Sequence, residues 1–407
     1  MKFSLIDLAN ILISRGGSFL LTLSIFFIIG RGMPPKEFAE FGYWWSISLM
    51  IGGLLLGGQS LAISRSFVLH GSLQHLVRPF VKFLIVLLSA ATLTLLLSTY
   101  VFEIDVERVF FWGVLFAFGF ILQIQVTLFA IFRVAEMFQV NFWATVLNLV
   151  LILVAVAIFA EMGRLEGIIN VYKSLVISFI VGLFGMFYIG RGEIKKVFKK
   201  GESRNQSLVG FFSGSLVFMV INAFNYVVVN ADFTISRNFM NSNDFFVAAT
   251  AKIYFERFVL PLLLVVAGVF SMRVLRERDI DNLYRYKYKN YLSYKKIAIF
   301  VFGILFICGG YIVFVELFRR DAVALNVTMV FCLAVGYMLM AINGVMLDAF
   351  AMKYNFGTVF VATFSMVFLY CVIQILAINM HGLLGWSVGC LLFNMFVHAT
   401  LFYMLRT

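Results

Sequence analysis

The sequence has little of what a soluble enzyme needs. Only 13% of its 407 residues are charged, and it has four prolines, four cysteines and four histidines. Soluble domains carry about 25% charged residues, so a large water-exposed surface is excluded. The histidines and cysteines lack the HxxxH and CxxC spacings of metal sites. Each cysteine lies in an apolar run, so we expect neither a disulfide framework nor a metal centre.

Apolar residues dominate instead. They make up 62% of the chain, and the mean hydropathy is +1.00. One crossing needs roughly 20 apolar residues, and with its connecting turn about 34, so the length allows about twelve crossings. We therefore expect an all-α polytopic membrane protein. The first run is too long for a cleavable signal. The predicted spans are 8–30, 40–62, 80–102, 109–131, 138–160, 166–189, 207–233, 245–271, 295–317, 323–350, 356–379 and 382–404.

The net charge of +12 is distributed as a membrane-orientation signal. With the N-terminus inside, the inner segments hold 21 Lys and Arg residues and the outer segments hold 7. This bias predicts that both termini are cytoplasmic and removes the reason to expect a nucleic-acid partner. The basic, tyrosine-rich segment 273–296 is expected to lie on membrane lipids at the headgroup level.

A basic polar segment divides the chain near its midpoint. We predict an N-terminal six-helix lobe over 1–190, a cytoplasmic linker over 191–206 and a C-terminal six-helix lobe over 207–407. A weak internal sequence repeat supports the division into two halves. A shift of 206 residues superposes Arg31 on Arg237, and each of these arginines lies in a short polar turn. Both turns follow an odd-numbered span, which indicates a parallel repeat.

Charged residues within the spans are the candidate functional residues, because a charge at membrane depth is costly unless it faces a partner or a wet cavity. Arg15 lies about seven residues into the first span, followed by two glycines. It either faces a ligand or reaches back to the inner interface, where Asp7 is a further candidate partner. Lys173 lies a similar distance from the outer end of the sixth span, where snorkelling is the competing interpretation.

Spans seven and eight are richer in polar residues. At 100° per residue, Asn222, Asn225 and Asp232 form one stripe on an apolar helix. Lys252 and Glu256 have the i,i+4 spacing of an ion pair. Asp232 and Lys252 could also pair as a structural bridge between neighbouring helices.

Arg257 follows that pair near mid-depth, where we expect it to face a central cavity. The deep charges then number four cations, Arg15, Lys173, Lys252 and Arg257, against two anions, Asp232 and Glu256. This excess favours an anionic ligand, and arginine suits phosphate because it can bind it bidentately. Intramembrane amides such as Gln125 and Asn148 are expected to form interhelical hydrogen bonds, with sugar contacts as the alternative.

No pattern of catalysis is present. The sequence has no glycine-rich phosphate loop, no nucleophile elbow and no paired carboxylates on an extramembrane domain. We therefore expect neither an enzyme nor a cofactor. Coupling to protons or Na⁺ through Asp232 or Glu256 remains a hypothesis.

Three stretches resemble the polysaccharide repeat-unit flippases, a branch of the MATE-like MOP exporter superfamily. Residues 27–43 (FIIGRGMPPKEFAEFGY) resemble the first-loop pattern, 57–65 (GGQSLAISR) resemble the exit of the second helix, and 230–273 resemble helices seven and eight. The motifs cover about a fifth of the chain. The first helix departs from the family pattern around Arg15.

The resemblance implies two six-helix lobes around a central cavity. It also implies transport of a polyprenyl-diphosphate-linked oligosaccharide to the outer leaflet for O-antigen, capsule or exopolysaccharide assembly. The expected location is the bacterial inner membrane, with the polysaccharide polymerase machinery as a candidate partner. The substrate-binding candidates are Arg15, Lys173, Lys252, Arg257, Asn222 and Asn225. A drug or cation antiporter on the same scaffold and a membrane-embedded glycan polymerase are the alternatives.

Overall fold

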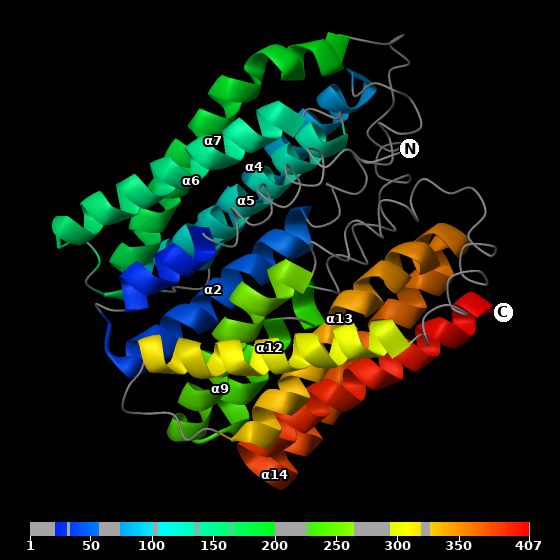
Figure 1. The fold of residues 1–407 in the computed structure, drawn as a ribbon. Coiled ribbons are helices and arrows are strands. Elements are labelled where there is room, and N and C mark those ends of the chain that lie inside the picture. Colours follow the sequence, from blue (N-terminus) through cyan, green and yellow to red (C-terminus); the bar gives the residue numbers. More distant parts are fainter. Residues whose placement is uncertain are drawn as a thin grey trace. The chain divides into compact units, whose positions relative to one another are not determined.

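The structure is a computed structural model of the 407-residue chain. It describes residues 21–30, 33–56, 74–100, 105–134, 138–163, 165, 167–199, 226–228, 230–263, 294–318 and 326–406. These parts are almost entirely helical and contain no strand (Figure 1). The fold class predicted from the sequence, an all-α polytopic membrane protein, is therefore confirmed.

Several helices have the length and composition of membrane spans. Within the described residues, five segments qualify: Val106–Phe129, Gln139–Glu161, Ile168–Gly192, Val327–Leu347 and Phe356–Leu405. The last is 50 residues long, enough for two crossings at about 20 residues each. Hydrocarbon offers the backbone no hydrogen-bond partner, so helices that satisfy their own amides are the expected solution for such apolar sequences.

The chain packs into two compact units. One comprises Met1–Leu21 with Trp44–Val227, and the other comprises Thr22–Tyr43 with Val228–Thr407. The second unit therefore includes a short segment from the beginning of the chain. There, Arg237 Nη2 lies 3.0 Å from Glu40 Oε1 and its guanidinium lies over the ring of Tyr43. The lobe boundaries at 190 and 207 stay a prediction.

The first unit is a bundle of apolar helices. It contains the later part of α2 (Pro35–Leu56), α4 (Gln74–Tyr100), α5 (Val106–Val134), α6 (Phe138–Glu161) and α7 (Ile168–Lys199). Helix α6 packs along α7, and both contact α5 (Figure 1). The ring of Phe118 packs edge-on against Trp45 and Phe179. Gly52 and Gly119 let α2 and α5 approach closely, because a Cβ on either would overlap the other helix's backbone.

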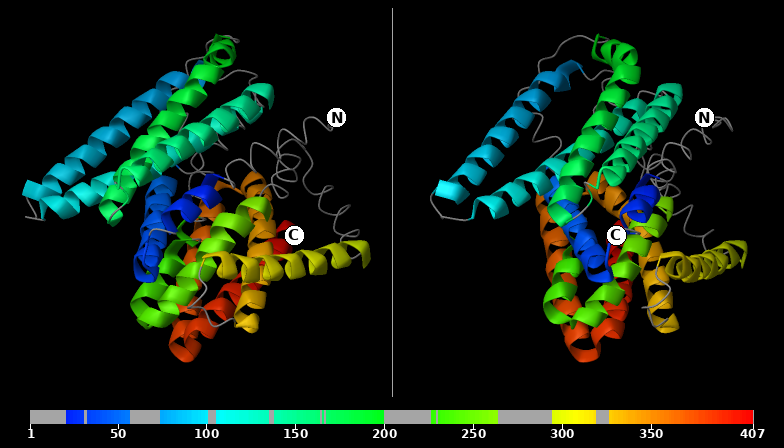
Figure 2. Two further views of the ribbon diagram at one scale, coloured as in Figure 1. Left: turned by 60° about the vertical axis from the view of Figure 1, so that its left-hand side comes forward. Right: turned by 90° about the vertical axis from the view of Figure 1, so that its left-hand side faces the viewer.

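The second unit is built on a helical hairpin. It contains α9 (Ser242–Tyr254), a π-helical segment η1 (Phe255–Val259), α12 (Tyr294–Phe318), α13 (Val327–Lys353) and α14 (Phe356–Arg406). Gly382 interrupts α14 at φ 55°, a left-handed value that favours glycine. The two arms of α14, before and after Gly382, pack against each other and form the hairpin. Tyr370 on one arm and Phe393 on the other have ring centroids 4.7 Å apart. Helix α13 packs along this hairpin (Figure 2).

Several helices extend beyond their predicted spans. Helix α7 continues to Lys199, through the first part of the predicted linker 191–206. This stretch contains three Lys residues, one Arg and one Glu, which are good helix formers, so the helix continues after the apolar run ends. The helical segment 230–239 likewise passes the predicted end at 233. The remaining linker residues lie outside the described residues.

Candidate functional site

A buried group of charged side chains lies in the second unit. It consists of Asp232, Lys252, Glu256 and Arg257, and we refer to these four residues as the charge cluster. Asp232 comes from the segment 230–239, Lys252 from α9 and the other two from η1. All four are buried among apolar residues. Buried charges persist only when they are paired, so their contacts decide what the cluster can do.

Local sequence explains how Lys252 is presented. Helix α9 begins at an asparagine cap, because Asn241 Oδ1 accepts a hydrogen bond of 2.8 Å from the backbone N–H of Asp244. The side chain of Asn241 also donates to the carboxylate of Asp244 at 2.9 Å. This cap fixes the start of α9, and Lys252 follows in its last turn, next to the π-helical segment.

The π-helical segment determines where Glu256 and Arg257 point. In η1 the backbone N–H of Leu260 donates to the carbonyl of Phe255, five residues earlier. Such segments are rare and occur often at functional sites, because the wider turn redirects side chains. This segment was not predicted, because a hydropathy pattern does not distinguish an α-helix from one wider turn.

Lys252 pairs with two carboxylates at once. Its Nζ contacts Asp232 Oδ1 and lies 2.7 Å from Glu256 Oε1. The expected bridge to Asp232 and the expected i,i+4 pair with Glu256 are thus both present. The side chain of Lys252 is 1% exposed, and its ammonium also lies 4.8 Å from the ring centroid of Phe233.

Arg257 occupies the edge of the charge cluster. Its Nη2 lies 3.5 Å from Glu256 Oε2, a longer contact than that of Lys252, and its side chain is 10% exposed. The sequence offered no obvious partner for Arg257 within its own helix, whereas the structure pairs it with the preceding residue. Glu256 therefore faces two cations, and the four charges sum to zero.

Two distant side chains complete the surroundings. Tyr337 of α13 donates its hydroxyl to Glu256 Oε1 at 3.3 Å. Trp386 of α14 donates its indole N–H to Asp232 Oδ2 at 3.3 Å. Sequence reasoning missed both residues, because they lie 81 and 154 positions away from their partners. A tyrosine and a tryptophan in the middle of apolar spans were the available signal, since buried aromatic polar groups need partners.

Aromatic stacking holds the π-helical segment in place. The ring of Phe255 stacks between Tyr311 of α12 and Tyr337, with centroid distances of 6.0 and 5.4 Å. Tyr254 donates its hydroxyl to the carbonyl of Ile307 at 2.8 Å. The turn that carries Glu256 and Arg257 is therefore fixed by neighbouring helices.

The other predicted site residues are not brought to the charge cluster by the described contacts. Lys173 of α7 is half-buried, and its ammonium lies 4.9 Å from the ring centroid of Phe110 near the start of α5. A lysine over an aromatic ring near a helix end suits an interfacial position as well as a ligand contact. Arg15, Asn222 and Asn225 lie outside the described residues.

Intramembrane amides form the expected interhelical hydrogen bonds. Gln125 of α5 donates to Asn148 Oδ1 at 3.1 Å and to the carbonyl of Phe179 at 3.4 Å. A second polar group was not anticipated: Asn343 of α13 donates to the backbone carbonyl of Asn394 at 3.0 Å and lies 3.0 Å from His398 Nδ1. These bonds join helices rather than hold a ligand.

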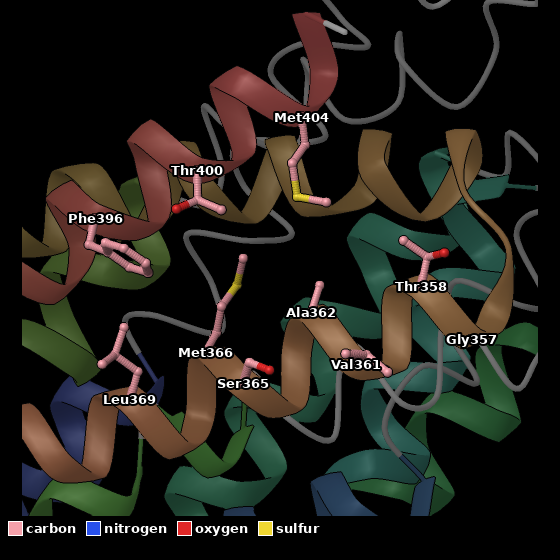
Figure 3. Close-up of a pocket in the computed structure, with 10 residues that line it drawn as sticks. All are labelled: Gly357, Thr358, Val361, Ala362, Ser365, Met366, Leu369, Phe396, Thr400 and Met404. Carbon is pink, nitrogen blue, oxygen red and sulfur yellow. The ribbon is translucent and has the colours of Figure 1, made fainter.

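An open groove of about 640 Å³ lies between the two arms of α14 (Figure 3). Ten residues line it, and none is charged: Gly357, Thr358, Val361, Ala362, Ser365, Met366, Leu369, Phe396, Thr400 and Met404. An uncharged apolar groove on a membrane-spanning hairpin is expected to face lipid. The charge cluster thus remains the stronger candidate site.

Nothing in the described parts of the chain forms a metal centre, since no group of three or more His, Cys, Asp or Glu residues could hold an ion. The described cysteines are free thiols. The arrangement is therefore a set of paired charges inside an apolar helix bundle. Charges at membrane depth are candidates for contact with a substrate or an ion, so the charge cluster is the candidate functional site.

Solved structures share the fold of this chain over nearly its full length. An outward-facing multidrug resistance MATE family transporter of the MOP superfamily matches with a TM-score of 0.67 at 16% identity, over 98% of this chain and 93% of that one. An inward-facing one matches with a TM-score of 0.62 at 17% identity, over 95% and 94%. No protein-family model matches the sequence. No curated protein matches it either.

A third neighbour differs in its binding pocket. It is a MOP superfamily transporter from Pyrococcus furiosus Vc1, described as having a binding pocket of reverse polarity that suggests a different function. It matches with a TM-score of 0.64 at 16% identity, over 98% of this chain and 93% of that one. The chain thus has the fold of the MOP superfamily transporters. All three of these neighbours are described as transporters.

Proposed function

We propose that this protein flips a polyprenyl-diphosphate-linked oligosaccharide from the cytoplasmic to the outer leaflet by alternating access. The step would serve assembly of a surface polysaccharide such as O-antigen, capsule or exopolysaccharide. The proposed location is the bacterial inner membrane with both termini cytoplasmic. The MOP transporter fold and the flippase-like stretches of the sequence support this assignment.

The position of Arg257 is the observation that carries the proposal. Its guanidinium lies at the edge of the charge cluster and is the more exposed of the cluster's two cations. Arginine can bind a diphosphate bidentately, and this interaction is strong where water is excluded. A diphosphate cannot cross hydrocarbon bare, so a transporter for it must supply such a group. Lys173, Arg15, Asn222 and Asn225 are the further proposed substrate contacts.

Net transport in one direction also requires a bias. Asp232 and Glu256 are the proposed sites for coupling to an ion gradient, because they are the carboxylates of the charge cluster. In this structure both are bound to Lys252. An exchanging ion would therefore have to compete with a covalently tethered ammonium. Consumption of the product at the outer face would supply the bias without any ion.

A drug or cation antiporter is the second candidate. Two neighbours with this fold are multidrug resistance transporters, and the charge cluster contains two carboxylates that a hydrophobic cation could bind. We favour the anionic substrate, because each carboxylate already faces a cation. The glycan polymerase has less support, since the solved structures that share this fold are transporters.

Depletion of the protein in its native host tests the proposal. Polyprenyl-linked glycans would be labelled, and their accessibility to an added glycosidase would be measured in spheroplasts. We expect intact repeat units to accumulate in a form that the glycosidase cannot reach. Complementation with wild type or Arg257→Lys should restore accessibility, fully and in part respectively, whereas Arg257→Gln should restore little. Arg237→Gln is the matched control, because Arg237 lies on the exposed end of a helix outside the charge cluster.

The other outcomes of this experiment would contradict translocation or the role of Arg257. Normal accessibility with unpolymerised units would refute translocation and identify a polymerase. Unchanged glycan lipids after depletion would refute both, and export of hydrophobic cations would then be measured. Full rescue by Arg257→Gln would remove Arg257 from the substrate contacts, even if flipping itself were demonstrated.

A further inference from the structure

A lysine ammonium occupies the position between two carboxylates in the charge cluster. Lys252 Nζ contacts Asp232 Oδ1 and lies 2.7 Å from Glu256 Oε1, and all three side chains are at most 3% exposed. Trp386 and Tyr337 each donate a hydrogen bond to one of these carboxylates and hold it in place. The two carboxylates thus converge on one point, and the ammonium is at that point.

We propose that Lys252 is a tethered cation filling a binding site for a free monovalent cation, whose ligands are the oxygens of Asp232 and Glu256. This goes beyond the proposed transport activity and does not depend on which substrate is carried. While Lys252 is in place, no free ion can bind these carboxylates, so consumption of the product is then the source of the transport bias. An ammonium and an alkali ion satisfy the same requirement, because each neutralises carboxylates that cannot both stay charged side by side in an apolar surrounding. The hydroxyl oxygen of Tyr337 is near enough to add a neutral ligand.

Charge balance selects a monovalent ion. The intact cluster contains two anions and two cations, so it is neutral. Loss of the lysine charge leaves a net charge of −1 in a buried place, and one monovalent cation restores neutrality. A divalent cation would leave an excess of +1. Oxygen ligands favour hard cations, so Na⁺ and K⁺ are the expected occupants.

Arg257 does not fill the same position. It approaches Glu256 through Oε2, whereas Lys252 approaches through Oε1. Removal of the lysine therefore leaves the contact between Arg257 and Glu256 in place, and the oxygens on the other side become available. If Lys252 served packing alone, its removal would leave no cation site, and an alkali ion would not stabilise the variant. The two interpretations differ in one measurable quantity, the response of stability to sodium.

Thermal unfolding of the purified full-length chain in detergent tests the proposal. Tryptophan fluorescence would follow unfolding in NaCl, KCl or choline chloride at constant ionic strength and pH. We expect wild type to unfold at the same temperature in all three salts. Lys252→Ala should unfold at a lower temperature in choline chloride and should gain roughly 3–6 °C in Tm for each tenfold rise in Na⁺ or K⁺ above its Kd.

Two matched controls isolate the site. The double variant Lys252→Ala with Asp232→Asn is neutral without any added ion, so its Tm should not respond to sodium. Lys173→Ala removes another half-buried lysine outside the charge cluster and should not create a sodium response. Trp386 gives a second readout, because its indole N–H contacts Asp232, so tryptophan fluorescence of folded Lys252→Ala should change on titration with NaCl.

Several outcomes would overturn the proposal. One is a sodium-selective rise in the Tm of wild type, because the site would then already bind a free ion. Another is a folded Lys252→Ala that responds to no cation, or only to a fall in pH. Lys252→Gln, which keeps a polar side chain of similar reach, serves where the alanine variant does not fold. Failure of both variants to fold in Na⁺ or K⁺ would also overturn it, since a free ion would then not replace the ammonium.

Discussion

Glu256 is the residue whose charge holds the cluster together, and Glu256→Gln tests this directly. Glutamine has nearly the same size and keeps an oxygen that can accept a hydrogen bond from the Tyr337 hydroxyl. That hydroxyl lies 3.3 Å from Glu256 Oε1. The substitution removes one negative charge that lies close to both Lys252 and Arg257. The cluster then carries a net charge of +1 in a buried position.

The expected loss of stability follows from these contacts. Breaking a buried ion pair by removing one partner costs about 3–5 kcal/mol, because the other charge stays buried without compensation. Lys252 and Arg257 both lose the carboxylate that lies between them, so both contribute to the cost. For a cooperative unit of roughly 200 residues, 1 kcal/mol corresponds to about 2–4 °C, so Tm should fall by about 6–20 °C.

A double-mutant cycle separates the charge effect from the loss of one contact. The unfolding free energies of Glu256→Gln, Lys252→Met and the double variant would be measured in sodium-free detergent solution. The double variant retains one anion, Asp232, and one cation, Arg257, and is neutral. It should therefore be more stable than the sum of the single losses predicts, by about 0.5–3 kcal/mol.

Two results would refute this reasoning. If Glu256→Gln unfolds within about 1 kcal/mol of wild type, then the carboxylate does not balance the two cations. If the double variant equals the sum of the single variants within about 0.5 kcal/mol, then the residues are energetically independent despite the 2.7 Å contact.

Three further substitutions test helix packing within the units by thermal unfolding in detergent. Gly119→Ala should cost about 1–3 kcal/mol, because its Cβ would overlap the carbonyl oxygen of Ser48, and an unchanged Tm would show that the helices separate freely. Tyr254→Phe should cost about 0.6–1.7 kcal/mol, because the bond to the carbonyl of Ile307 is lost, and a gain in stability would contradict that account. Asn343→Leu should cost a similar amount by removing the bond between α13 and α14, whereas wild-type stability would show that packing alone joins them.

The positions of most spans could be predicted because hydropathy alone determines them. The run at 138–160 corresponds to α6, Phe138–Glu161, and the run at 295–317 corresponds to α12, Tyr294–Phe318. A helix in hydrocarbon must be apolar over about 20 residues, so the length of the apolar run predicts the length of the helix. The ends of helices that leave the membrane are less predictable. Helix α7 shows this, since its basic extension to Lys199 is helical without being apolar.

The candidate site was only partly predictable, and the reason is sequence separation. Lys252 and Glu256 lie one helical turn apart, so the i,i+4 rule finds them. Asp232 lies on the preceding helix, and its pairing was one of the alternatives considered. Tyr337 and Trp386 were not found, because a contact between distant helices depends on packing that a single sequence does not reveal.

The backbone around these residues was also unpredictable. The π-helical turn of η1 and the left-handed Gly382 both occur within apolar runs of ordinary composition. The assignment of Thr22–Tyr43 to the second unit is a further example. It depends on contacts such as that between Arg237 and Glu40, which lie far apart in the chain and in different predicted lobes.

The pairing pattern of the charge cluster bears on which class of substrate it could accept. A hydrophobic cation that sought the two carboxylates would have to displace Lys252, an ammonium attached to the chain and therefore present at a high effective concentration. A diphosphate would meet Arg257 first, at the more exposed edge of the charge cluster, where the contact with Glu256 is 3.5 Å long. Rotation of one guanidinium costs less than removal of a bound ammonium from two carboxylates. Under the proposed function, Lys252 would therefore disfavour cations and Arg257 would favour an anionic substrate.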